Sequence, residues 1–324
     1  MCTSMAMKTS GFYFGRNMDI DYGFGEQVVI APRNYPFQFR KAGCGSRHSA
    51  IIGMAAIKEN YPLYAEAMNE QGLCMAGLNF PYNAYYPDYT ENEKYNISPF
   101  ELIPWILGSC RNLIEAKRLL SETHIIAVPF SENLPLTPLH WHIADKSGSI
   151  VVESMKDGMH VYENPVNVLT NNPPFEFQMY NLAQYLNLHT GVPENCFSEK
   201  GILPFGKGLG SYGLPGDFSP ASRFVKTAYL LLNSVCDTDE NSSVSQFFHI
   251  LDSVSVVSGG ILPNSTSRYL TTYSCCMNAD RGVYYYKTYS NNRISAVNMK
   301  KENLHSQKLI TFEVDRKQSV ASVN

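Results

Sequence analysis

Residues 1–7 read MCTSMAM and residues 12–19 read FYFGRNMD, and the polar segment Lys8–Gly11 separates them. Two runs rich in apolar and aromatic residues on either side of a turn predict a β-hairpin at the start of the chain. A cysteine is therefore expected at the first position of the first strand, inside a sheet. Any fold assigned to this chain has to explain why a thiol stands there.

The register of this hairpin decides which side chains lie beside Cys2. Two-residue turns are the commonest hairpin connections, and such a turn within residues 9–11 makes paired residue numbers sum to 19 or 21. Cys2 then lies opposite Asn17 or Asp19. Either register brings the segment Gly15–Asp19 close to the thiol.

Cys2 can carry two catalytic groups at once. A small residue in second place permits removal of the initiator methionine, which would leave Cys2 with a free α-amine. The thiol is then a nucleophile, and the amine, with a pKa of roughly 7.7–8.0, is a base that no other residue has to position. The alternative is that Cys2 is an ordinary residue near the terminus.

Arg16 and Asp19 are the charged residues that the hairpin delivers to this cysteine. A cation beside a thiol favours the thiolate, which is the reactive form. A carboxylate can accept hydrogen bonds from the α-ammonium group and fix its orientation. Taken alone, the same two residues would equally suit an ion pair at the end of a surface strand.

Composition and charge exclude several classes of protein. The 324 residues are 44% hydrophobic and 12% aromatic and carry a net charge of −3. Without a basic cluster, we expect no nucleic-acid partner and no anionic membrane surface as a partner. We also expect no signal peptide and no membrane insertion, because the start lacks a basic region and the apolar runs are short. Eight cysteines without a CxxC pair then indicate free thiols in the cytoplasm.

The order of the expected elements indicates an α+β fold. Strands are predicted at both ends of the chain and helices are grouped between them, unlike the regular alternation of a doubly wound parallel sheet. Beyond the hairpin, strands are expected at Gln27–Ala31, Ala50–Ala55, His140–Ala144, Ser149–Met155, Met159–Glu163, Leu270–Asn278, Gly282–Tyr289, Ile294–Met299 and Lys308–Phe312. Helices are expected at Pro99–Gly108, Asn112–Glu122, Phe175–Tyr185, Ala221–Leu232 and Val244–Val254. Residues 186–220 form one long irregular segment.

Two further motifs match the residue pattern of a cofactor site but lack the sequence context that such a site requires. His140 and His142 share one face of a predicted strand, which could suit a metal, but no third ligand stands at a suitable spacing. Residues 208–213 match GxGxxG, but Leu214-Pro215 follows where a nucleotide-binding fold requires a helix. We therefore expect strand histidines, a loop, and neither a metal nor another cofactor.

Five motifs in order along the chain resemble one family. They are Met1-Cys2-Thr3-Ser4, Phe14-Gly15-Arg16-Asn17-Met18-Asp19, Ala76-Gly77-Leu78-Asn79-Phe80-Pro81, Leu169-Thr170-Asn171-Asn172-Pro173 and Leu214-Pro215-Gly216-Asp217-Phe218-Ser219-Pro220-Ala221-Ser222-Arg223-Phe224. Together they are similar to the choloylglycine hydrolases, the conjugated bile salt hydrolases. That family is a branch of the N-terminal-nucleophile hydrolases, which also contains penicillin V acylases.

The resemblance implies a fold and a catalytic set. The fold would be an αββα four-layer sandwich, with residues 1–324 as a single hydrolase domain. Cys2 would be the nucleophile and, through its amine, the base, while Arg16 and Asp19 would contact the thiol and the amine. Asn171 and the backbone N–H of Asn79 would form the oxyanion hole. The remaining member of the implied set is a second arginine, Arg223.

The resemblance also implies a substrate and an assembly. Asn79 occupies a position that is typically tyrosine in penicillin V acylases, so conjugated bile salts are the expected substrates. The steroid would lie among Met18, Ala65, Phe130, Leu134 and Leu139, which would otherwise be core residues. The rival functions are a penicillin V acylase, an acyl-homoserine-lactone acylase and a non-catalytic steroid- or lipid-binding protein. Residues 186–220 are similar to an extension between subunits, which implies a homotetramer.

Overall fold

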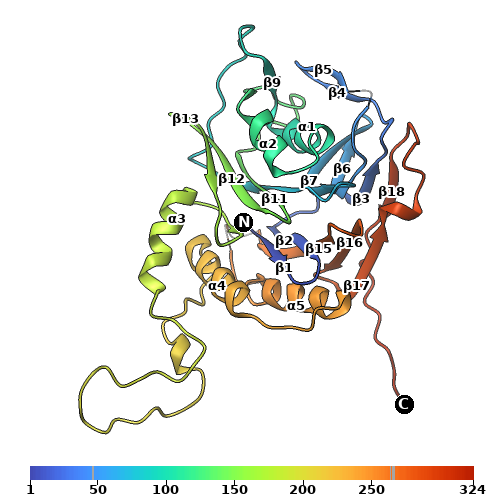
Figure 1. Cartoon of the computed structure of the whole chain (residues 1–324). Helices are drawn as coiled ribbons and strands as arrows, with labels where there is room; N and C mark the ends of the chain where they lie inside the picture. Colours follow the sequence, from blue (N-terminus) through green and yellow to red (C-terminus); the bar gives the residue numbers. More distant parts are fainter. Residues whose placement is uncertain (46, 263, 265–266) are drawn as a thin grey trace.

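Two antiparallel sheets packed face to face, with helices outside them, make up the structure (Figure 1). The computed structural model describes residues 1–45, 47–262, 264 and 267–324. The six-stranded sheet has the order β14 (Val168–Leu169), β1 (Cys2–Lys8), β2 (Phe12–Ile20), β15 (Leu270–Asn278), β16 (Val283–Thr288) and β17 (Asn291–Asn298). The eight-stranded sheet has the order β13 (Gly158–Glu163), β12 (Gly148–Met155), β11 (Leu139–Asp145), β8 (Cys74–Asn79), β7 (Tyr61–Asn69), β6 (Ile51–Lys58), β3 (Glu26–Ala31) and β18 (Ile310–Glu313).

Helices cover the outer face of each sheet. On the eight-stranded sheet lie α1 (Leu102–Ser109) and α2 (Leu113–Leu120), and on the six-stranded sheet lie α4 (Pro220–Asn233) and α5 (Glu240–Asp252) (Figure 1). Each sheet is therefore buried on both faces, which is why its strands read as nearly continuous apolar runs. The predicted α+β class and the αββα layering are confirmed.

The remaining elements are short. One further helix, α3 (Phe175–Leu182), packs beside α4, and two small ribbons pair β4 (Phe37–Phe39) with β5 (Gly43–Gly45) and β9 (Tyr95–Ile97) with β10 (Thr123–Ile125). Four 3₁₀ turns lie at Pro99–Glu101, Ala183–Tyr185, Leu209–Ser211 and Met299–Lys301. No helix in the described part of the chain is both long and apolar enough to cross a membrane.

The predicted hairpin exists, but its predicted register is wrong by one residue. Lys8 pairs with Phe12 and Cys2 pairs with Met18, so paired numbers sum to 20 rather than 19 or 21. The connection has three residues instead of two, and the Thr9 N–H donates to the Gly11 carbonyl across it. Since side chains alternate along a strand, one residue decides which side chain lies beside Cys2.

Two central strands were not predicted from the sequence, β7 and β8. β7 contains an extra residue, because Met54 of β6 pairs with Glu66 while the next residue, Ala55, pairs with Tyr64. Ala65 is thus a β-bulge, which shifts the alternation of side chains along the strand. Tyr64 consequently packs on the helix side, and Glu66 points between the two sheets. The bulge hides the period-two pattern that identifies a strand.

The structure confirms the long irregular segment that was predicted at residues 186–220. Apart from the turn at Leu209–Ser211, residues 186–219 form no helix or strand, and in Figure 1 the segment extends away from the body of the molecule as an arm. The cysteines whose side chains are described are unpaired, as expected: Cys2, Cys74, Cys110, Cys196, Cys236, Cys275 and Cys276. The side chain of Cys44 lies outside the described part.

Candidate active site

Cys2 is buried at the first position of β1 and lines a cavity of about 500 Å³. Its thiol lies 3.9 Å from the Sδ atom of Met18, the residue directly opposite on β2. Met1 is attached, so the nitrogen of Cys2 is an amide in this structure, and the amino group of Met1 donates to the Asp19 carbonyl at 2.6 Å. The register of the hairpin therefore determines that the Cys2 sulfur faces Met18.

Arg16 lies on the same face of β2 as Met18, between the two sheets. Its guanidinium is fully buried and donates to the Gly77 carbonyl on β8 at 2.6 Å and to the Ala65 carbonyl on β7 at 3.2 Å. Burial, the largest single influence, lowers the pKa of Arg16, but Cys2, Tyr273 and Glu66 together outweigh it, so that the pKa is raised above its ordinary value. The geometry places a permanent cation at the thiol.

Arg223 approaches Cys2 from the opposite side of the hairpin. It stands in the first turn of α4, which begins at Pro220 after the N-cap Ser219. The guanidinium donates to the carbonyl of Cys2 and, at 2.6 Å, to the hydroxyl of Thr3. Burial lowers the pKa of Arg223, although Asp19 and Cys2 act in the other direction. This second arginine contacts the backbone of Cys2, not its sulfur.

The start of α4 is fixed by a network that the sequence motif encodes. The Asp217 carboxylate accepts from the Ser219 backbone at 2.8 Å and from the Ser222 hydroxyl at 2.6 Å. Hydrogen bonds from these two serines lower the pKa of Asp217 to about 2, so it is ionised at neutral pH. A charged cap of this kind holds the first helical turn, and with it Arg223, in place.

Asp19 lies on the Arg223 face of the hairpin and is fully buried. One oxygen accepts from the Thr271 hydroxyl at 2.6 Å, and the other lies 3.9 Å from Arg223. That second oxygen, Oδ2, has no hydrogen-bond partner among the described residues. Burial raises the pKa of Asp19, and Arg223 and Thr271 oppose the increase. The carboxylate thus retains hydrogen-bonding capacity beside the Cys2 backbone.

Asn171 connects Cys2 to β8. Its Oδ1 accepts from the Cys2 nitrogen at 2.7 Å and from Arg223 at 2.9 Å, so the orientation of its amide is fixed. The Nδ2 group therefore points to β8 and donates to the Asn79 carbonyl at 2.7 Å. One N–H of Nδ2 remains for another acceptor.

The backbone N–H of Asn79 points to the same side. Phe80 donates to Pro138 across the β8–β11 ladder, and in an antiparallel pair the hydrogen-bonded positions alternate. Asn79 is therefore at a position whose N–H and C=O both face away from β11. β7 pairs with β8 only as far as Ala76, so this edge of Asn79 lies beyond the last pair of the β7–β8 ladder. Two N–H donors, one from Asn79 and one from Asn171, lie close to Cys2.

The cavity brings together some of the predicted residues and not others. Among its lining residues are Cys2, Arg16, Asn79 and the five predicted for the steroid: Met18, Ala65, Phe130, Leu134 and Leu139. Asp19, Asn171 and Arg223 do not line it and instead contact Cys2 or one another from behind. Most of the remaining lining is apolar, from residues that sequence reasoning did not select: Ile20, Tyr22, Phe24, Leu63, Tyr64, Pro99, Phe100, Ile103, Pro129, Pro135, Leu136, Pro138, Trp141 and Tyr269.

Sequence reasoning also missed a buried carboxylate, Glu66 on β7. Its Oε2 lies 3.7 Å from Arg16, and both side chains are completely inaccessible to solvent. A glutamate gives no signal in a run such as Tyr61–Asn69 unless the strand and its bulge are already known. The site therefore contains two buried arginine–carboxylate pairs, one on each face of the hairpin.

Comparisons with known proteins identify the family of this chain. Residues 2–312 match the model of the linear amide C–N hydrolases, choloylglycine hydrolase family. The chain belongs to the choloylglycine hydrolase family. It is 47% identical to a bile salt hydrolase/transferase of Lactiplantibacillus plantarum and 39% identical to one of Clostridium perfringens, with all of each chain covered.

Solved structures place the chain in the same fold. A variant of the conjugated bile acid hydrolase from Clostridium perfringens, 39% identical, superposes with a TM-score of 0.92 over the whole of both chains. A penicillin V acylase from Agrobacterium tumefaciens, 18% identical, has a TM-score of 0.76 with 96% of this chain and 90% of its own chain covered. The second likeness concerns the fold alone. As a member of this family, the chain is a hydrolase of linear amide C–N bonds.

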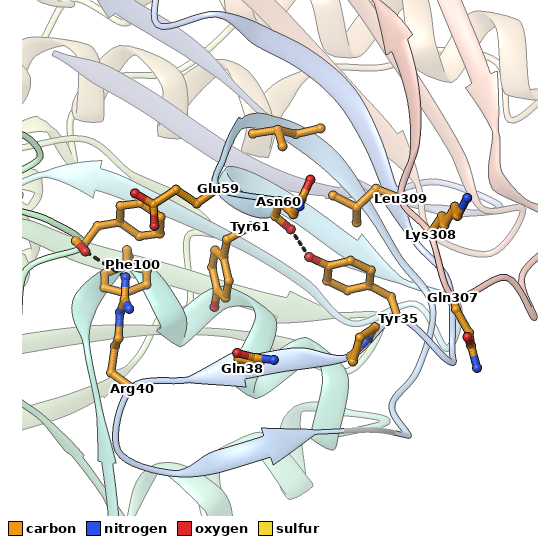
Figure 2. Close-up of a pocket in the computed structure, with 13 residues that line it drawn as sticks. Tyr35, Gln38, Arg40, Glu59, Asn60, Tyr61, Phe100, Gln307, Lys308 and Leu309 are labelled. Carbon is orange, nitrogen blue, oxygen red and sulfur yellow. Dashed lines mark hydrogen bonds between the residues drawn. The ribbon is translucent and has the colours of Figure 1, made fainter.

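Figure 2 shows a second cavity, of about 690 Å³, lined by residues that include Tyr35, Arg40 and Tyr61. The two cavities share Phe100 and Phe130, and Arg40 donates to the Phe130 carbonyl at 2.8 Å. The Tyr35 hydroxyl bonds to the Asn60 carbonyl within this second space. None of the residues described in contact with Cys2 lines it, whereas Cys2 itself lines the first cavity.

The two strand histidines are internal hydrogen-bonding residues. His140 bonds to Glu153 at 3.0 Å and to the Thr170 carbonyl at 2.9 Å, and His142 bonds to Ser4 at 2.9 Å. Burial and the neighbouring His140 lower the pKa of His142 to about 3, so it is neutral. Both rings bond to specific protein groups, which agrees with the prediction that they are ordinary strand histidines.

Proposed function

We propose that this chain hydrolyses the amide bond between the steroid acyl group and glycine or taurine in conjugated bile salts, with Cys2 as the nucleophile. The observation that carries the proposal is a thiol and a buried arginine in the lining of a largely apolar cavity. Relatives that match the chain from end to end are named bile salt hydrolase/transferase. No cofactor takes part in this chemistry.

The first step of the proposal is removal of Met1. Met1 lines the cavity beside Cys2, so its loss exposes the α-amine and enlarges the space at the sulfur. The Cys2 nitrogen already lies 2.7 Å from Asn171 Oδ1, and that oxygen remains an acceptor for the new amine. The Asp19 carboxylate provides a negative charge near the same amine, and its Oδ2 is available as a further acceptor.

The second step is attack on the amide. The thiolate of Cys2, stabilised by Arg16, forms a bond to the carbonyl carbon, and the oxygen becomes an oxyanion. The Asn79 N–H and the free N–H of Asn171 donate to that oxygen. Removal of one such donor costs about 2.7–4 kcal/mol in comparable sites. The C–N bond breaks as the leaving nitrogen takes a proton from the α-ammonium group of Cys2.

The third step releases the bile acid. The α-amine of Cys2, now neutral, takes a proton from water, and the hydroxide oxygen attacks the thioester carbon. The C–S bond breaks, the free acid leaves, and the thiolate returns beside Arg16. Arg223 does not react in this scheme, because its hydrogen bonds to the Cys2 carbonyl and to Asn171 serve to hold both residues.

The shape and lining of the cavity favour a steroid amide over the alternatives. Apolar burial stabilises a bound ligand by about 25 cal/mol per Å², which suits a rigid steroid body, before the costs of association are subtracted. A penicillin V acylase would use the same chemistry on a phenoxyacetyl amide. Asn79 in place of the tyrosine typical of those enzymes favours bile salts, and the buried set around Cys2 disfavours a protein that only binds lipid.

One assay tests the substrate assignment. Protein whose start at Cys2 is verified by intact mass is given taurocholate, glycocholate and penicillin V, and the released amine is measured. We expect hydrolysis of the two bile salts. Hydrolysis of penicillin V alone would overturn the substrate but leave the Cys2 mechanism, whereas full activity of a chain with Met1 retained would overturn the amine as base.

We further propose that copies of this chain assemble in the cytoplasm as a homotetramer through residues 186–220. The arm carries large apolar side chains that are more than four-fifths exposed: Leu186, Phe197, Leu203, Phe205 and Tyr212. A second copy of the chain that covers them would remove this surface from water. A monomeric mass by light scattering at micromolar concentration would contradict the assembly.

A further inference from the structure

Arg16 is a buried cation whose environment has to remain balanced when the charge of Cys2 changes. Its guanidinium has no access to solvent, and its hydrogen bonds to Gly77 and Ala65 go to neutral carbonyls. An uncompensated charge inside a protein costs several kcal/mol. During the proposed reaction Cys2 alternates between a thiolate and an uncharged thioester, so the sulfur is a counter-charge only part of the time.

Glu66 is placed to be the permanent counter-charge. Its Oε2 lies 3.7 Å from Arg16 Nη1, and Glu66 is not among the residues that line the cavity. The bulge at Ala65 supplies both contacts, because it turns the Ala65 carbonyl to Arg16 and re-aims Glu66 between the sheets. One local irregularity of β7 therefore builds the environment of the catalytic arginine.

The groups that face Glu66 favour its ionised form. Tyr273 on β15 donates to Oε2 at 2.8 Å, and Tyr284 on β16 donates to Oε1 at 2.6 Å. Cys275 on β15 also faces the carboxylate, and Arg16 on β2 completes the surroundings. Burial raises the pKa of Glu66, while Arg16 and the two tyrosines oppose that increase. Both tyrosines are themselves almost completely buried, so this cluster is closed to water.

We propose that Glu66 is a positioning residue that neutralises and holds Arg16 whenever the sulfur of Cys2 is uncharged, so that the thioester can form and break. The inference rests on the proposed function, since it requires the Cys2 thioester. Without the carboxylate, only the thiolate would balance Arg16. The thiolate would then be stabilised relative to the thioester, and acylation would be slowed.

This role of Glu66 predicts that its loss lowers turnover of substrate without slowing the alkylation of Cys2. In Glu66→Gln we expect kcat for taurocholate to fall at least about tenfold while KM changes less than about twofold. Alkylation of Cys2 by iodoacetamide at pH 6, followed by mass spectrometry of the N-terminal peptide, should be as fast as in the unmodified enzyme or faster. The alkylation assay needs no substrate, so it remains informative even if bile salts are not hydrolysed.

A matched control lies on the same segment of chain. Glu70 pairs with Arg33 through a bond of 2.9 Å from Arg33 Nε, remote from Cys2, and Glu70→Gln removes an arginine-paired carboxylate in the same isosteric way. We expect kcat to be unchanged there. An unchanged kcat in Glu66→Gln, or a parallel fall of kcat and of the alkylation rate that indicates displaced Arg16, would overturn the proposal.

A milder variant gives a second test if Glu66→Gln does not fold. Tyr284→Phe keeps the ring and removes one hydrogen bond to the carboxylate, so the pKa of Glu66 should rise further. Glu66 would then be protonated at a higher pH, and kcat at pH 5 should fall more, relative to kcat at pH 7, than in the unmodified enzyme. An identical ratio of the two kcat values in both proteins would contradict the role of the Glu66 charge.

Discussion

The two faces of the β1–β2 hairpin each carry a buried arginine paired with a buried carboxylate, and the two pairs contact different parts of one cysteine. On the inner face Arg16 lies 3.7 Å from Glu66 and points to the cavity. On the outer face Arg223 lies 3.9 Å from Asp19 and bonds to the Cys2 carbonyl. The inner pair lies on the side of the Cys2 sulfur, and the outer pair lies on the side of the Cys2 backbone, where the proposed removal of Met1 would expose the amine.

In the proposed mechanism Cys2 supplies both a nucleophile and a base, and the two faces of the hairpin provide separate surroundings for these two groups. The thiol and the α-amine of Cys2 are only a few bonds apart, but alternation along the strand sends their partners to opposite sides of the sheet. The pKa of Arg16 is raised and that of Arg223 is lowered, since only Arg16 has its loss from burial outweighed by negative neighbours. Each face can therefore be altered separately.

The largest expected effect is the loss of the residue that both faces share. Cys2→Ala should reduce taurocholate hydrolysis by at least about 10⁴-fold, because no other group supplies the nucleophile. Binding of taurocholate, measured by calorimetry, should persist, since the apolar cavity is intact. Cys2→Ser should also be nearly inactive at neutral pH, and substantial turnover by Cys2→Ala would contradict the whole mechanism.

The next effect separates the two arginines. Arg16→Met and Arg223→Met should each lower kcat/KM on the order of 10²-fold, because each leaves a buried carboxylate without its partner. Cys2 alkylation at pH 6 should slow in Arg16→Met and change little in Arg223→Met. Melting temperatures verify folding of both variants, and equal slowing of alkylation would show that the two faces are not distinct.

How far the sequence predicts this site depends on the local regularity of each strand. The outer pair could be predicted from the sequence, because Asp19 stands in the hairpin and Arg223 stands in a long recognisable motif that continues into α4. Glu66 could not be predicted from the sequence, because the bulge at Ala65 breaks the alternation on which strand prediction relies. Likewise, a two-residue turn was predicted within residues 9–11, and the three-residue loop that forms shifts the register by one.

A smaller effect concerns the substrate, and it tests the inner face. We expect kcat/KM for conjugated bile salts to exceed that for penicillin V by at least about tenfold, or about 1.4 kcal/mol in transition-state binding. The physical reason is the apolar lining beside Arg16, which a steroid would cover more completely than a phenoxyacetyl group. A preference for penicillin V would leave both faces of the hairpin in place and change only the assignment of the cavity.

The smallest effect belongs to single residues of the cavity wall, remote from both arginine pairs. Leu134 is half-buried and lines the cavity, so Leu134→Ala should raise KM for taurocholate by about threefold to tenfold through lost apolar contact. Phe130→Ala should act in the same direction, but its ring is buried between the two cavities, so part of its effect will be lost stability.

For both wall variants kcat should change little, because neither side chain contacts Cys2 or the groups bonded to it. Leu232→Ala is the matched control, since that leucine is exposed on α4, lines neither cavity and should leave KM as it is. A fall in kcat at constant KM would mean that the wall acts on the chemistry and not on binding. In that case the separation between the apolar cavity and the charged hairpin would have to be given up, and Phe130 would join the residues that position the scissile amide.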